Sequence, residues 1–298
     1  MIGDCDHYFS PYIFGVNQGM SRLGHWHSQV NMRQPFEVIA QRVLDVKPDI
    51  LWTHMLLWAP IGSPSVDRLV DLCRRVAKNG TKVVIHDGDY KSATRYPNDI
   101  SEWCAAALCN HQFDRSAWKC PVLYWPYFAF AQELFQVPEK LDYGLFFAGT
   151  VRADATYAAR SQLLEEIRAK GVDLSIPPLS EGNTLFRTAE IATASQAVLG
   201  FGRPGVTGWV DTRVFQYPGA GAILLHDEAP QLIPWEHYVP YVSGNAESVA
   251  AAYRCVEAMS STEQMNLRSR AFDYVQRKHS SVARVKQVIE FIFEEKAK

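Results

Sequence analysis

Short apolar segments alternate with amphipathic stretches of about 10 to 15 residues, and this alternation is the strongest constraint on the fold. Parallel neighbouring strands need a long crossover connection, which is usually a helix, so the pattern predicts βαβ units and parallel sheets. In the first half we expect helices at 35–46 and 64–78 and strands at 49–53, 81–85 and 121–125.

The second half repeats the alternation and then becomes helical. We expect strands at 143–147, 172–176, 196–200 and 222–225, and helices at 157–170, 184–194, 210–217, 246–259, 262–278 and 281–295. A polar, Pro-containing segment at 137–142 separates the two series. We therefore predict an α/β chain of two Rossmann-like, doubly wound domains, 1–142 and 143–298, with a ligand cleft between them, at the carboxyl ends of the strands.

Length and charge support this division. The chain has 298 residues, and a domain typically has about 150. The net charge of -2 argues against the general cationic field of a protein whose main partner is nucleic acid. Basic residues nevertheless gather in the first half, where a local basic face is an open alternative: Arg22, Arg33, Arg68, Arg74, Arg75, Lys78, Lys82, Lys91 and Arg95.

Targeting signals and cysteines point to a cytoplasmic protein. No apolar run approaches the roughly 18 residues needed to cross a bilayer, and the N-terminal segment has two acids and no basic region, which is unlike a signal peptide. The six cysteines are scattered and contain no CxxC pair, so we expect reduced, buried thiols. A zinc site at Cys104, Cys109, His111 and Cys120 is the weaker alternative, because that spacing fits no common zinc pattern.

A strand that ends on glycine opens the second half. Phe146-Phe147-Ala148-Gly149-Thr150 leads toward a helix. Unpaired amides at such a junction can bind phosphate, although many junctions of this kind bind nothing.

A glycine-rich loop and a helix follow a later strand, over 199–221. Glycine lets the backbone approach a ligand closely, and the guanidinium groups of Arg203 and Arg213 suit phosphate. The alternative is a solvated loop in which the glycines only form turns.

Ionisable side chains also follow the strand at 81–85, in the order His86-Asp87-Gly88-Asp89. An Asp-x-Asp pair can bind a divalent cation, since hard cations favour carboxylate oxygens. A carboxylate or imidazole at a strand end can instead take a proton from an attacking hydroxyl. Turn capping by the two aspartates is the third interpretation.

The order of motifs in the second half resembles the CgeB-like, spore-maturation-type glycosyltransferases, which are GT-B enzymes. The resemblance rests on six segments: Phe147-x-Gly149, Arg160 opening a helix with Leu163 and Leu164, the 199–221 loop, Thr212-Arg213-x-Phe215-Gln216, Gly219-x-Gly221 with the strand through His226-Asp227, and His279-Ser280-Ser281-x-x-Arg284. It covers about 143–295, and the first half only by architecture. It implies that segment 281–295 returns to the N-terminal domain.

The resemblance implies a metal-independent, hexosyltransferase-type enzyme that moves a sugar from a nucleotide-diphosphate sugar, most simply a UDP-sugar, to a hydroxyl. The implied donor residues are Gly149, Thr150, Arg152, Gly202, Arg203, Arg213, Gln216 and Gly221. Where the family has a glutamate for the ribose hydroxyls, this chain has Gln216, which accepts hydrogen bonds without the stronger charge assistance.

The first half would then hold the acceptor, which could be a glycan, a small molecule, a protein or modified DNA. Asp87, His86 and Asp89 are the candidate catalytic groups, and His25, Trp125 and Tyr127 the candidate acceptor-side residues. Packing roles are the alternative for His25 and for the two aromatics. Phage-type glycosylation of hydroxymethylated pyrimidines in DNA is a second possible activity, and a catalytically degenerate sugar-nucleotide-binding protein is a third.

Overall fold

The computed structural model divides the chain into two compact units. One unit comprises Met1–Pro126 and Val282–Lys298, and the other comprises Tyr127–Ser281. The structure describes residues 1–3, 10–54, 66–87, 102–109, 118–125, 128–129, 140–149, 151, 157–177, 185–201, 213–227 and 234–294.

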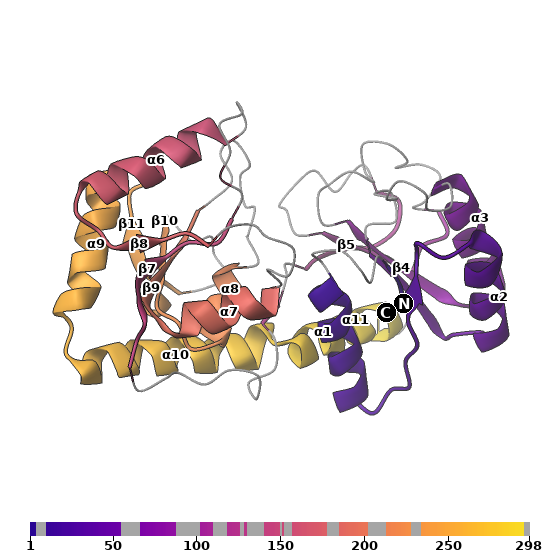
Figure 1. Cartoon of the computed structure of the whole chain (residues 1–298). Coiled ribbons are helices and arrows are strands. Elements are labelled where there is room, and N and C mark those ends of the chain that lie inside the picture. The colour runs from indigo at the N-terminus through magenta and orange to yellow at the C-terminus, as the bar shows by residue number, and fades with distance from the viewer. Residues whose placement is uncertain are drawn as a thin grey trace. The chain divides into compact units, whose positions relative to one another are not determined.

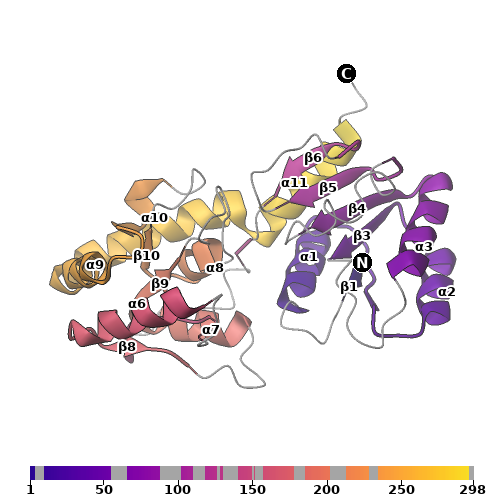
Figure 2. The same ribbon diagram turned by 90° about the horizontal axis from the view of Figure 1, so that it is seen from above.

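The first unit is built on a six-stranded sheet in the order β2-β1-β3-β4-β5-β6, in which every pair is parallel. Helices α2 and α3 lie on one face of this sheet, and α1 and α11 lie on the other (Figures 1 and 2). The elements are β1 (Ile2–Gly3), α1 (Ser10–Arg22), β2 (Val30–Asn31), α2 (Phe36–Val46), β3 (Ile50–His54), α3 (Val66–Lys78), β4 (Lys82–Asp87), β5 (Ala106–Cys109), β6 (Val122–Tyr124) and α11 (Ser281–Glu294).

The second unit is built on a five-stranded parallel sheet in the order β11-β10-β9-β7-β8. Helices α6 and α9 lie on one face, and α7, α8 and α10 lie on the other (Figure 1). The elements are β7 (Tyr143–Phe146), α6 (Ala158–Ala169), β8 (Leu174–Ser175), α7 (Leu185–Thr193), β9 (Ser195–Gly200), α8 (Arg213–Gly219), β10 (Leu224–Asp227), the 3-10 helix η3 (Trp235–His237), β11 (Val239–Tyr241), α9 (Ala246–Ala258) and α10 (Ser261–His279).

Local sequence sets where the helices begin and end. Ser260 and Glu263 form a reciprocal capping box that starts α10, and the Asn245 side chain accepts from the Ser248 N–H at the start of α9. These side chains satisfy amides that have no partner inside the helix. Lys47 ends α2 in the left-handed region, with φ of 47°, directly before the proline that prevents a further turn.

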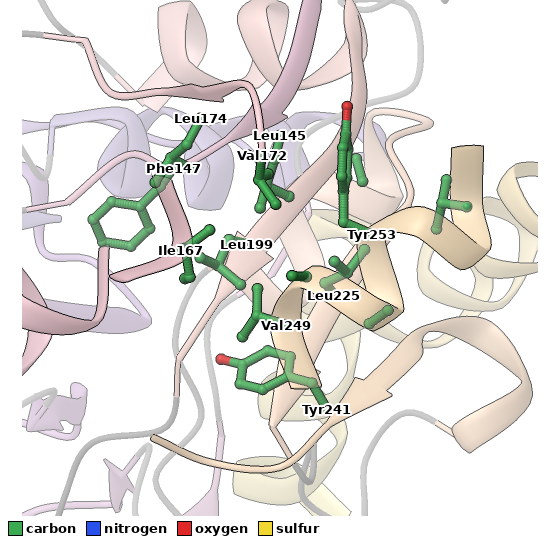
Figure 3. Close-up of a cluster of buried hydrophobic side chains, with 14 of the residues drawn as sticks. Leu145, Phe147, Ile167, Val172, Leu174, Leu199, Leu225, Tyr241, Val249 and Tyr253 are labelled. Carbon is green, nitrogen blue, oxygen red and sulfur yellow. The ribbon is translucent and has the colours of Figure 1, made fainter. Parts of the chain in front are cut away.

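Each sheet has its own hydrophobic core. In the second unit, apolar residues from alternate positions of the strands pack against α6 and α9. Figure 3 shows this cluster, with Leu145, Leu199 and Leu225 of the sheet beside Val249 and Tyr253 of α9. The opposite face carries the intervening residues, as the contact between the rings of Phe146 and Tyr217 shows, with centroids 6.3 Å apart.

The predicted alternation of helices and strands is confirmed, with element ends that differ by a few residues. Four strands were not predicted: β1, β2, β5 and β11. The division into units places segment 127–142 with the second sheet and the helix from Val282 onward with the first.

Candidate active site

The topology of the second sheet marks one position for a ligand. Strands β7 and β9 are neighbours, but the chain leaves β7 through α6 on one face and approaches α8 on the other after β9 (Figure 1). In open α/β sheets, ligands bind outside the carboxyl ends of the strands at such a reversal of the strand order. Phe147, Ala148 and Gly149 follow β7 there, and Phe201 follows β9.

Gly149 and Arg213 meet at this point. The Nε of Arg213 donates to the carbonyl oxygen of Ala148 at 2.7 Å, and its guanidinium carbon lies 5.4 Å from the centroid of the Phe147 ring. A Cβ atom at Gly149 would lie 2.8 Å from Nη2 of Arg213 and 2.6 Å from Cζ of Phe147. The absence of a side chain at position 149 therefore makes room for the guanidinium.

A second guanidinium lies over the same aromatic surface. The Arg160 guanidinium carbon is 5.8 Å from the centroids of both Phe147 and Phe201 and 5.2 Å from that of Tyr157. The rings of Phe147 and Phe201 contact each other edge to face at 5.0 Å. Aromatic faces attract cations, so these rings hold two permanent positive charges at the ends of β7 and β9. Guanidinium groups bind phosphate oxygens in bidentate fashion.

A buried imidazole and carboxylate end the neighbouring strand β10. Nδ1 of His226 donates to the main-chain carbonyl oxygen of Asp227 and lies 3.0 Å from Oδ1 of the same residue. The hydroxyl of Ser243 donates to Oδ2 of Asp227 at 2.7 Å. Tyr241 donates its hydroxyl to the carbonyl of Gly200, and burial, with a smaller contribution from Asp227, raises the pKa of this phenol.

Gln216 lies one turn beyond Arg213 on α8, and residues three apart share a helix face. Its side chain is only 4% exposed. Its Oε1 has no hydrogen-bond partner among the described residues. A buried carbonyl oxygen without a donor is uncommon in folded proteins, so this atom calls for a donor that the described residues do not supply.

Gly221 lies before the amino end of β10, whereas Gly149 follows the carboxyl end of β7. It has φ of +89° and follows α8, where its N–H donates to the carbonyl oxygen of Pro218 and its own carbonyl oxygen accepts from Nη1 of Arg268 at 2.7 Å. Helix termination accounts for this glycine, and the structure does not bring it to the Gly149–Arg213 pair. The other predicted donor residues, Thr150, Arg152, Gly202 and Arg203, lie outside the described residues.

The predicted acceptor residues belong to the first unit. His86 is buried near the carboxyl end of β4, where its ring stacks on Tyr12 at 4.8 Å and contacts Trp125 edge-on at 5.5 Å. Trp125 is also buried, and its indole N–H donates to the carbonyl oxygen of Arg284 at 2.9 Å. Both side chains therefore pack in the interior of this unit. The side chain of Asp87, and all of Asp89 and Tyr127, lie outside the described residues.

His25 lies at the amino edge of the first sheet, away from the carboxyl end of β4. It follows Gly24, whose φ of +80° ends α1, and its N–H donates to the carbonyl oxygen of Met20 at 2.9 Å. The exposed His25 side chain lines a cavity of about 440 Å³ together with Asp49 and Ile50, at the start of β3.

The basic residues of the first unit are partly neutralised in pairs. Arg68 forms an exposed ion pair with Glu37 at 2.6 Å, and Nη1 of Arg74 lies 3.8 Å from Oδ1 of Asp71.

Within the described ranges, no group of three or more metal-ligating side chains could hold a metal ion. The helices in those ranges include none that is long and apolar enough to cross a membrane.

Gly149, Arg213 and Gln216 were predicted from the sequence as donor residues. Arg160, His226 and Asp227 belong to the segments that carry the family resemblance, but no role was predicted for them. The His-Asp pair follows an apolar strand in the same way as His86-Asp87. The Arg160 site was harder to predict, since it depends on two aromatic residues from different strands.

Comparison with known proteins identifies the fold. No protein-family model matches the chain, and no curated protein sequence matches it. Solved structures do match over nearly the whole chain. Sucrose-phosphate synthase from Thermosynechococcus elongatus has a TM-score of 0.64 at 9% identity, covering 99% of this chain and 98% of that chain.

Two further structures show the same likeness. A glycosyltransferase from Rickettsia africae has a TM-score of 0.62 at 10% identity, covering 99% of this chain and 96% of its own. Anabaena HepE, solved in complex with UDP-glucose, has a TM-score of 0.57 at 10% identity, covering 98% of each chain. The fold is that of GT-B glycosyltransferases, which confirms the predicted fold class.

Proposed function

We propose that this protein is a glycosyltransferase that moves a sugar from a nucleotide-diphosphate sugar to a hydroxyl acceptor. The observation that carries the proposal is the meeting of Gly149 and Arg213 at the carboxyl ends of β7 and β9, with Arg160 over the same rings. It gains support from the GT-B fold and from the UDP-glucose bound to Anabaena HepE, which makes a UDP-sugar the first donor to test.

The reaction builds up negative charge on the leaving group of the donor. Breaking the bond between the sugar and the diphosphate leaves negative charge on the departing phosphate oxygens. Preorganised cations lower the barrier when they face that charge in a site with little water. Arg213 and Arg160 would supply this stabilisation, while Gln216 would accept from a donor hydroxyl. Because two guanidinium groups are present, we propose that transfer needs no metal ion.

The acceptor hydroxyl must lose a proton as it attacks the anomeric carbon. Asp87 and Asp89 remain our proposed bases. His86 is the weaker candidate because its ring is stacked in the interior. The acceptor class stays open among glycans, small molecules, proteins and modified DNA, and membership of the CgeB-like family is likewise part of the proposal.

A panel of UDP-, GDP-, CDP-, ADP- and dTDP-sugars tests the function. A ligand at 100 times its Kd stabilises the folded protein by about 2.7 kcal/mol, so at least one donor should raise the melting temperature by several degrees. Release of the nucleoside diphosphate, in the presence and absence of EDTA, then measures turnover and metal dependence.

The outcomes separate the candidates. Stabilisation with slow, EDTA-resistant hydrolysis supports an active enzyme. Stabilisation without turnover on any acceptor favours the degenerate binding protein, for which the neutral Gln216 is the motivating residue. If no nucleotide sugar stabilises the protein, the glycosyltransferase assignment is wrong.

A further inference from the structure

His226 holds a buried nitrogen that no described residue satisfies. The side chain is 2% exposed, and its Nε2 has no hydrogen-bond partner among the described residues. The two groups beside Nδ1 are the Asp227 carbonyl and carboxylate oxygens, and both can only accept while the carboxylate is ionised. Nδ1 must therefore carry a proton, and in that tautomer of the imidazole Nε2 is an acceptor.

The surroundings of His226 maintain this arrangement. Gly200 is its partner on β9, and a Cβ atom there would lie 2.5 Å from Cδ2 of the imidazole and 3.3 Å from Nε2. Ser243 holds the Asp227 carboxylate from the other side. Leaving a buried acceptor unsatisfied is costly, and such atoms in native proteins call for an explanation such as a binding or catalytic role.

The strand register places His226 beside the proposed donor site. His226 pairs with Gly200, and Gly200 and Ala148 each lie two residues beyond the pair Val198–Phe146. The three positions are therefore at one level across β10, β9 and β7. Ala148 is the residue whose carbonyl oxygen accepts from Arg213.

Gln216 provides a second acceptor on the same face of the sheet. The His226 side chain is on the face opposite the α6–α9 core, because it alternates with the core residue Leu225. That face is covered by α8 (Figure 1), which carries Gln216 with its own unsatisfied Oε1. A ligand that satisfies both acceptors must present two donors, and a vicinal diol carries two O–H groups on adjacent carbons.

We propose that His226 determines which nucleotide sugar the protein binds. Its Nε2 accepts a hydrogen bond from one hydroxyl of a vicinal diol on that nucleotide sugar. Gln216 accepts from the other hydroxyl. The diol belongs either to the ribose or to the transferred hexose. This inference rests on the proposed function and names the part of the donor that the second unit recognises.

The test combines changes in the protein with changes in the ligand. His226→Phe keeps a ring of similar size and removes both nitrogens. Calorimetric titrations measure Kd for UDP, 2′-deoxy-UDP, 3′-deoxy-UDP and UDP-glucose with the native protein and the variant. A neutral hydrogen bond in a site is worth about threefold to tenfold in affinity.

If the ribose supplies the hydroxyl, His226→Phe weakens the binding of UDP and UDP-glucose by that factor. It leaves the affinity unchanged for the deoxynucleotide that lacks the hydroxyl bound by His226. If the hexose supplies it, the variant weakens UDP-glucose alone. Gln216→Leu is the matched variant. It should lose the part of the affinity that depends on the other hydroxyl of the diol. Equal weakening of all four ligands by His226→Phe, or no weakening of any, overturns the inference.

A second measurement uses the native protein alone, so it does not depend on whether a variant folds. Long-range proton–nitrogen NMR spectra of the imidazoles report the protonated nitrogen of His226, and UDP or UDP-glucose should shift its Nε2 resonance while Nδ1 stays protonated. An Nε2 resonance that stays unchanged with both saturating ligands overturns the inference. A native protein that binds none of the ligands instead overturns the proposed function.

Discussion

Gly149 and Arg213, 64 positions apart in the sequence, occupy a shared space in which a Cβ atom at position 149 would come within 2.8 Å of Nη2 of the arginine. The arginine is held there by the Ala148 carbonyl oxygen and the Phe147 ring. A positive charge is thus fixed against a bare stretch of backbone at the reversal of strand order.

Gly149→Ala should weaken nucleotide-sugar binding much more than it weakens folding. The new methyl group must displace Arg213 or Phe147, and losing one charge-assisted hydrogen bond costs about tenfold or more in affinity. Gly171→Ala is the control. It has φ of +78° and open space around it, so it should lower the free energy of unfolding by about 1 kcal/mol without changing Kd. Equal Kd values for both variants would show that donor binding does not need the space at position 149.

Arg160→Met should weaken UDP-glucose binding by about fivefold to twentyfold, because the change keeps the apolar stem and removes the charge over Phe147. Arg168→Met on the same helix is the matched control. Arg168 donates to the Leu174 carbonyl oxygen, close to the other end of α6. Calorimetry should find its Kd unchanged, and comparable losses in both variants would show a general effect of charge.

Trp125→Phe should destabilise the protein by about 1 to 3 kcal/mol, because it removes a buried hydrogen bond and part of a packed ring. Chemical denaturation measures this loss, and donor binding should stay the same. A variant with native stability but impaired transfer to the acceptor would instead show that Trp125 acts in the acceptor site.

Alkaline pH should destabilise the protein through its buried thiols. Burial raises the pKa of Cys73 from 9.0 to about 12, so the unfolded chain loses this proton first. The stabilisation is complete below pH 9 and is lost as pH rises toward 12, by up to about 1.4 kcal/mol per pH unit. Cys73→Ala should be less stable at pH 8 but show a shallower decline between pH 9 and 11 in urea titrations. An unchanged slope would contradict the assignment.

Much of the fold could be predicted because helical spacing and short apolar runs are local signals. The strands that were missed lack such signals. Strands β1 and β2 have two residues each, too few to show a pattern, and β5 is an Ala-Ala-Leu-Cys segment whose composition does not favour a strand. Its place between β4 and β6 depends on pairing with both neighbours.

The Gly149–Arg213 pair could be predicted because a glycine after a strand and an arginine at a helix start each point to the carboxyl ends of the strands. Gly221 and His25 lie elsewhere, each after a helix. A glycine that ends a helix and a glycine that admits a ligand look alike in the sequence. Their positive φ values, at Gly221 and Gly24, appear only in three dimensions. The Arg160 contacts needed the sheet order as well.

The most direct test of the donor site is a calorimetric titration of UDP-glucose into the native protein and into Arg213→Ala. We expect saturable binding of one ligand per chain to the native protein and a loss of at least tenfold in affinity for the variant. Binding of equal strength to both proteins would contradict the central role of the Gly149–Arg213 pair.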